Sequence, residues 1–169
     1  MKNLKRTCIS LLLLTATTTL VSAATFEQTG VKEGNTRLSV NLYSTVPDEG
    51  DTSVSVNGEL GRFLTDDIEV ALATLITASN GETFYYLKPG ANYYFLKTPT
   101  LTPYVGGHLY YFDSTADGAD SSFGNNYHVG AHMFFSENVA VTGELGMDSF
   151  EFTDYLQTYT NVSLTYFFD

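Results

Sequence analysis

Apolar and polar residues alternate along most of this chain. In the stretch NVSLTYFF, residues 161–168, Asn161, Ser163 and Thr165 mark one side. The other side is apolar and consists of Val162, Leu164, Tyr166 and Phe168. A period of two residues is typical of a β-strand with one apolar and one polar face.

Seven further stretches show the same alternation of apolar and polar residues, and turn-forming residues separate them. They cover residues 37–45, 52–63, 68–77, 83–96, 101–112, 127–135 and 139–147. No stretch after residue 23 shows a convincing helical period, so the pattern predicts an all-β protein of eight strands.

The segments between these strands alternate in length. VPDEGD, SNGE, DSTADGADSSFGNN and DSFEFTDY are mostly long and acidic, whereas TDD, KTPT and SEN are short. Short turns at one end and longer loops at the other are typical of an antiparallel, up-and-down transmembrane β-barrel. The strand lengths agree, because a tilted strand needs about 9–11 residues to cross a bilayer. A β-sandwich in water stays open as an alternative, since alternation alone does not distinguish lipid from a protein core.

The N-terminus has the pattern of a secretory signal peptide. Lys2, Lys5 and Arg6 precede the apolar run CISLLLLTATTTLVSA, which ends in small residues. We expect cleavage after Ala23 or Ala24, because the threonines interrupt the run too early for a membrane-spanning helix. The predicted organisation is a signal peptide over 1–23, an N-terminal segment over 24–36 and a barrel over 37–169.

Composition narrows the possible partners. Beyond residue 23 the chain has five basic residues and 19 acidic ones, which gives a formal charge of −14. Nucleic acid is therefore excluded as an expected partner, because phosphate binding relies on basic surface. No cysteine remains beyond residue 23, so we expect no disulfide framework.

The stretches LTPYVGGHLYYF, YHVGAHMFF and VSLTYFF resemble the small eight-stranded outer-membrane β-barrels of Gram-negative bacteria, of the outer-membrane protein X and Ail type. The resemblance implies a monomer in the outer membrane, without a cofactor, in contact with lipid, lipopolysaccharide and the barrel-assembly machinery. It also implies that the terminal strand carries the assembly signal, through Val162, Leu164, Tyr166 and Phe168. Asp169 departs from the family pattern, in which an aromatic residue comes last.

The residues between the outward-facing apolar ones are expected to form a polar network in the barrel interior. Its predicted members are Arg37, Glu59, Glu69, Lys88, His108, His128, His132 and Glu144. Eight strands leave an interior that side chains can fill, so we expect packed ion pairs rather than an open channel. In one strand, Pro89 followed by Gly90 predicts a bulge or kink.

Counting back from the turns predicts that both Glu144 and His108 lie opposite Gly130. This register brings the three histidines and Glu144 together, with Lys88 nearby. A transition-metal site is one interpretation of such a cluster, and a hydrogen-bonded plug in which Glu144 pairs with Lys88 or a histidine is the other. We favour the plug and expect no metal, because the sequence has no H-x-H spacing or other metal motif.

Catalytic motifs are missing from the sequence. It has no G-x-S-x-G element and no glycine-rich phosphate loop, and the acidic segment DSTADGADSS lacks the residue order of an EF-hand loop. We therefore expect a non-enzymatic outer-membrane protein with a structural or surface-interaction role through its acidic loops. A narrow solute or ion pore, and a soluble exported β-barrel that binds a lipophilic ligand, are the alternatives.

Overall fold

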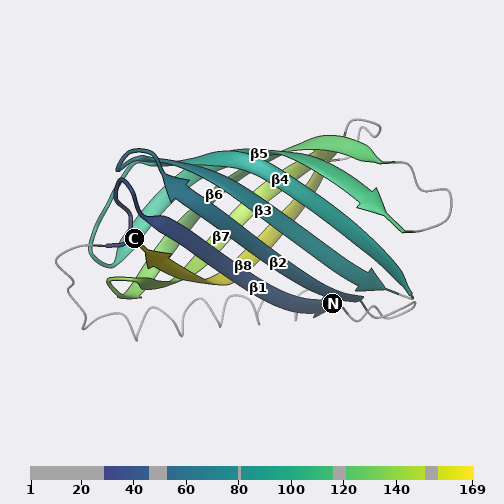
Figure 1. The fold of residues 1–169 in the computed structure, drawn as a ribbon, viewed down its shortest axis with the longest axis horizontal. Helices are drawn as coiled ribbons and strands as arrows, with labels where there is room; N and C mark the ends of the chain where they lie inside the picture. Colours follow the sequence, from purple (N-terminus) through teal and green to yellow (C-terminus); the bar gives the residue numbers. More distant parts are fainter. Residues whose placement is uncertain (1–28, 46–52, 80, 116–120, 151–155) are drawn as a thin grey trace, which may run out of the picture.

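The protein is a closed barrel of eight antiparallel strands, shown as a ribbon in Figure 1. The computed structural model describes residues 29–45, 53–79, 81–115, 121–150 and 156–169. The strands are β1 Thr36–Thr45, β2 Ser53–Phe63, β3 Ile68–Ser79, β4 Glu82–Tyr94, β5 Leu101–Ser114, β6 Ser122–Ser136, β7 Val139–Phe150 and β8 Leu156–Phe168. Each strand pairs with its sequence neighbours, and β1 also pairs with β8, so the predicted up-and-down barrel is confirmed. In the part of the chain described, no helix has the length and apolar character needed to cross a membrane.

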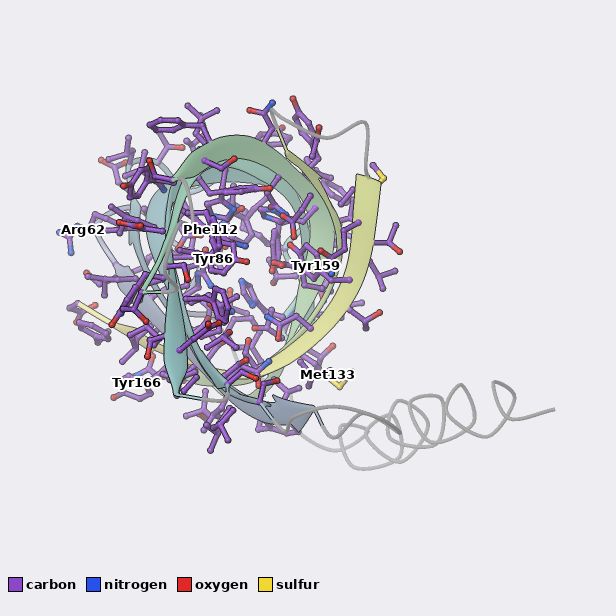
Figure 2. The ribbon with its side chains drawn as sticks, turned by 90° about the vertical axis from the view of Figure 1, so that its right-hand side faces the viewer. Arg62, Tyr86, Phe112, Met133, Tyr159 and Tyr166 are labelled. Carbon is purple, nitrogen blue, oxygen red and sulfur yellow. The ribbon has the colours of Figure 1, made fainter. Side chains whose placement is uncertain are left out.

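The barrel carries its apolar residues outside and its polar residues inside. Leu145 and Leu164, for example, are among the most exposed large hydrophobic residues, whereas Arg37 and Glu69 are fully buried. Figure 2 looks along the barrel and shows Tyr86 and Tyr159 within the ring of strands. The alternation in the sequence thus separates an outer face from an interior, as expected for strands with a period of two.

The N-terminal residues 29–35 pack against the end of the barrel that carries the short turns. Val31 is buried there against aromatic side chains, and the Phe63 N–H donates to the carbonyl of Asn35. The described part of the 24–36 segment is therefore a cap on this end of the barrel. The predicted signal peptide, residues 1–23, lies outside the described residues.

The register prediction is correct for one hairpin and wrong for the other. Glu144 pairs with Gly130 as expected, although a bulge between Phe134 and Ser136 shifts the turn itself. His108, however, pairs with Asn126, and Gly130 faces Tyr104 on this side, a slip of four residues. The error arose because both strands are longer than predicted. β5 ends at Ser114 and β6 already begins at Ser122, so the acidic loop between them is shorter than predicted.

The predicted bulge at Pro89 is wrong. Leu87 pairs with Tyr111 and Gly90 with His108, so the register of β4 on β5 is the same on both sides of the proline. Pro89 instead leaves a short gap in this ladder, while it stays paired with Leu72 of β3. Since proline lacks an N–H, a gap on one side costs less than a distortion of the whole strand.

Among the residues that the structure describes, the seam between β1 and β8 is the shortest ladder of the barrel. It joins five residue pairs, from Thr36↔Phe168 to Val40↔Leu164. The ladder of β1 on β2, by comparison, has ten. The seam lies at the short-turn end, where β1 begins and β8 ends (Figure 1).

Candidate functional site

Arg37 lies at the centre of the ion pairs in the interior. Its Nε donates to Glu69 Oε1 over 2.7 Å, and a terminal nitrogen donates to Glu59 Oε1 over 2.5 Å. The other terminal nitrogen donates to Ser39 Oγ over 2.7 Å. One buried guanidinium thus binds two carboxylates, an arrangement in which removing any partner would leave an unpaired charge.

Glu69 of β3 accepts hydrogen bonds at both of its oxygens. Arg37 occupies Oε1, while Asn92 Nδ2 and the Tyr94 hydroxyl donate to Oε2 over 2.9 and 2.7 Å. The carboxylate has no exposed surface. These bonds replace the water that a buried anion has lost.

A chain of hydrogen bonds leads from Tyr94 back to Arg37. Tyr94 lies 3.2 Å from His132 Nε2, and His132 Nδ1 lies 2.7 Å from Thr142 Oγ1. The threonine hydroxyl is 2.6 Å from Thr165 Oγ1, which is 2.8 Å from Ser39 Oγ. Because Ser39 in turn accepts from Arg37, the bonds form a ring through β1, β3, β4, β6, β7 and β8, which we call the polar ring.

An aromatic cluster lies at the short-turn end and closes the interior there. Phe134 and Phe167 have ring centroids 5.2 Å apart, and Phe63 lies 5.2 Å from Tyr94. Val31 of the N-terminal cap is buried in the same cluster. Together with the polar ring, these side chains form a seal across the barrel, as expected for so narrow a lumen.

Two of the three predicted histidines lie together. The rings of His108 and His128 stack with centroids 4.9 Å apart. His128 Nε2 lies 3.9 Å from Glu144 Oε2, and His108 Nε2 lies 3.7 Å from Glu59 Oε1. His132 belongs instead to the polar ring, where it contacts neither Glu144 nor the other histidines through a hydrogen bond among the described residues.

The half of the interior toward the long loops is hollow. A cavity of about 720 Å³, which we call the chamber, reaches from Glu59 and His108 to Ser53 and Gln157. The expectation of a completely packed interior is therefore wrong for this half. Side chains fill the short-turn half only, because there the residues are large and aromatic, whereas serine, threonine and asparagine line much of the chamber.

Lys88 and Glu144 both line the chamber, but the ion pair of Lys88 is with another residue. Lys88 Nζ lies 4.0 Å from Asp148 Oδ1 and lies over the rings of Tyr86 and Tyr110. Glu144 accepts instead from the hydroxyls of Tyr104 and Tyr159, over 2.9 and 2.8 Å.

Sequence reasoning missed several polar members of the interior, and the glycines could have revealed them. Gly106 lies under Asn92 and His128, Gly130 under Tyr104, and Gly146 under Tyr159, so closely that a Cβ at any of them would overlap those side chains. Asn126 and Asp148, which hydrogen bond to each other over 2.9 Å, were missed as well. An inward glycine on a strand indicates that a large neighbour occupies its space.

The predicted assembly-signal residues all lie on the outer face of β8. Val162, Leu164, Tyr166 and Phe168 are exposed, whereas the adjacent Phe167 points inward and is fully buried. Tyr166 lies outside the ring of strands in Figure 2. Within the described ranges, no group of three or more histidine, cysteine or acidic residues is arranged to hold a metal ion.

No protein-family model matches the sequence, and no curated protein matches it. Solved structures of small membrane barrels do match. The N-terminal β-barrel domain of Pseudomonas aeruginosa OprF is 20% identical, with 80% of this chain and 98% of that chain covered and a TM-score of 0.63. The outer membrane protein OprG from P. aeruginosa is 12% identical (84% and 99% covered, TM-score 0.60). Neisserial surface protein A is 13% identical (79% and 94% covered, TM-score 0.54). The chain therefore has the fold of small outer-membrane barrels.

Proposed function

We propose that this chain is an integral, non-enzymatic protein of a Gram-negative outer membrane, with a structural or surface-interaction role. The observation that carries the proposal is the inversion of the barrel, whose exposed face is apolar and whose interior holds buried ion pairs. In water such a face would be an aggregation surface, whereas in a bilayer it contacts acyl chains. The similar solved structures, which are named as outer-membrane and surface proteins, support this location.

The partners follow from this location. Lipid and lipopolysaccharide surround a monomeric barrel, and the barrel-assembly machinery reads the outward aromatic end of β8 through Tyr166 and Phe168. The connecting segments on the long-loop side carry seven acidic residues and no basic one, which makes them the surface for contacts outside the cell. Their acidic residues are Asp48, Glu49, Asp51, Asp117, Asp120, Glu151 and Asp154.

Membrane fractionation and heat-modifiable gel migration test the proposal. The protein should sediment with outer membranes, and the unboiled sample should migrate differently from the boiled one in SDS, because a closed barrel resists SDS until it is heated. Recovery in the periplasmic fraction with a single band would contradict the proposal. That result would favour a soluble exported barrel.

A narrow pore is the second candidate, and the hollow chamber is the observation in its favour. The seal formed by the polar ring and the aromatic cluster opposes it. We expect no reproducible current steps from the purified barrel in a planar bilayer. Steps whose size scales with salt concentration would establish the pore and displace the purely structural role.

A further inference from the structure

The chamber has the dimensions of a site for a small molecule. Its volume of about 720 Å³ lies within the range of roughly 300–1,000 Å³ that ligand pockets occupy. Its base is formed by Glu59 and His108, and its walls extend to Ser53 and Gln157 at the long-loop ends of β2 and β8. A guest could therefore enter from that end without crossing the seal.

The charged side chains of the interior do not balance. Arg37 and Lys88 are the arginine and lysine side chains of the interior, whereas its carboxylates among the described inward residues are Glu59, Glu69, Glu144 and Asp148, so the carboxylates outnumber these cations by two. Three of these carboxylates line the chamber, with side chains 12–16% exposed. Inside a barrel surrounded by lipid, an uncompensated charge is costly because the effective dielectric constant is low.

The base of the chamber also lacks a hydrogen-bond donor. His108 is 93% buried, since its exposed fraction is 7%, and its Nε2 has no hydrogen-bond partner among the described residues. This nitrogen lies 3.7 Å from Glu59 Oε1, which is already engaged by Arg37. A buried ring nitrogen left without a partner beside a carboxylate is a position where the N–H of a guest would be satisfied.

We propose that the chamber binds a small organic cation with a primary ammonium group. The ammonium group lies among the carboxylates of Glu144, Asp148 and Glu59, and the ring of Tyr159 offers it a cation–π contact. Asparagine side chains along the chamber wall hydrogen bond to the remainder of the guest; they are Asn41, Asn57 and Asn161.

Two features favour an ammonium compound over a metal ion or a neutral molecule. The carboxylates are spread over β2 and β7 rather than gathered into a metal-binding group, and such a group is not found in the described part of the chain. The connecting segments on this side carry only acidic charge, which raises the local concentration of cations at the entrance. A neutral guest would leave the excess of carboxylates without a cation.

The proposal goes beyond a structural role and does not depend on the membrane in which the barrel resides. Its test is titration calorimetry on the full chain refolded in detergent, with putrescine as the probe and 1,4-butanediol as the uncharged control of the same length. We expect saturable binding of one putrescine per barrel and no binding of the diol. Equal binding of both compounds, or no binding of either, would overturn the proposal.

Charge substitutions distinguish the chamber from the acidic exterior. Glu144→Gln should weaken putrescine binding by about tenfold or more, because it removes one carboxylate in a low-dielectric site. Glu137→Gln makes the same change on an exposed turn at the opposite end and should leave the affinity unchanged. Equal weakening by the two substitutions would place the cation outside the chamber and refute the proposal.

Lys88→Met provides a test of opposite sign that does not depend on the folding of the glutamate variant. Removal of the Lys88 ammonium group, which lies 4.0 Å from Asp148, frees that carboxylate and should tighten putrescine binding several-fold. Looser binding to the lysine variant would contradict the electrostatic basis of the site.

Discussion

At the scale of single residues, the polar ring determines where one histidine carries its proton. Tyr94 donates its hydroxyl hydrogen to Glu69, so it must accept from His132 Nε2–H. His132 Nδ1 then has a lone pair, which accepts from the Thr142 hydroxyl. Each hydroxyl has one hydrogen to donate, so Thr165 donates to Thr142 and Ser39 donates to Thr165, while Ser39 accepts from Arg37. All hydrogen bonds of the polar ring therefore point from Arg37 toward Glu69, and their dipoles are aligned between a cation and an anion.

We predict that His132 is neutral and carries its hydrogen on Nε2. Ring nitrogen chemical shifts of the ¹⁵N-histidine-labelled barrel would show this, with assignment by loss of the signals in His132→Gln. Thr142→Val removes the donor to Nδ1 and should shift the Nδ1 resonance most. A hydrogen on Nδ1, or on both nitrogens, would show that the polar ring runs in another direction.

The candidate site could be predicted from the sequence only in part. Alternation identified Arg37 and Glu69 as inward residues, because a period of two needs no knowledge of neighbouring strands. Their partners could not be found in this way, since Asn92 and Tyr94 lie on the neighbouring strand β4 and their contact with Glu69 depends on the register between β3 and β4. The slip of four residues at His108 shows how quickly an error in a long loop changes such contacts.

At the scale of elements, glycines on the inner faces of strands make room for large side chains. Gly146 of β7 is covered by the ring of Tyr159, which positions Glu144, whereas a Cβ added to the outward-facing Gly143 would have no atom within 4 Å. We predict that Gly146→Ala lowers the free energy of unfolding by about 1–3 kcal/mol, because the ring must move. Gly143→Ala on the same strand is the control and should change it by less than about 0.5 kcal/mol. Urea unfolding in detergent measures both, and equal effects would show that the glycines serve the strand backbone alone.

The two adjacent phenylalanines near the end of β8 have separate roles. Phe167 is 0% exposed and belongs to the aromatic cluster, whereas Phe168 is 38% exposed on the outer face. We predict that Phe167→Ala lowers the free energy of unfolding by about 3–5 kcal/mol through the cavity it leaves. Phe168→Ala should have a much smaller effect on stability and should instead slow insertion in cells, measured as the fraction of heat-modifiable protein over time. The reverse pattern would contradict this division.

Turn length explains why some elements were easier to predict than others. The short turn before β7 allows few registers between β6 and β7, so the predicted pairing of Glu144 with Gly130 is correct even though a bulge intervenes. The prediction began the sixth strand at Tyr127, whereas β6 begins at Ser122, because Asn125 interrupts the apolar positions of the outer face before Phe123 continues them. Alternation therefore underestimates a strand in which a polar residue interrupts the apolar face.

At the scale of the whole molecule, one substitution separates a barrel in lipid from a barrel in water. Leu145 is 58% exposed near the middle of β7. In a bilayer, Leu145→Arg should lower the free energy of unfolding by about 2–4 kcal/mol. For an exposed position of a soluble protein, the change would be within about 0.5 kcal/mol. Urea unfolding from phospholipid vesicles measures the difference, and an effect within the lower range would contradict the membrane location.

The short seam between β1 and β8 gives the closed barrel a preferred line of rupture. Five residue pairs hold this ladder, while each of the others has nine or more among the described residues. Above Val40 and Leu164 the two strands are linked by side chains such as Asn41 and Asn161 rather than by registered backbone pairs. A mechanical load on the chain ends would therefore part the cylinder along this line first. The other seven ladders would remain as one curved sheet, with the N-terminal cap still attached beside β2 through Asn35 and Phe63.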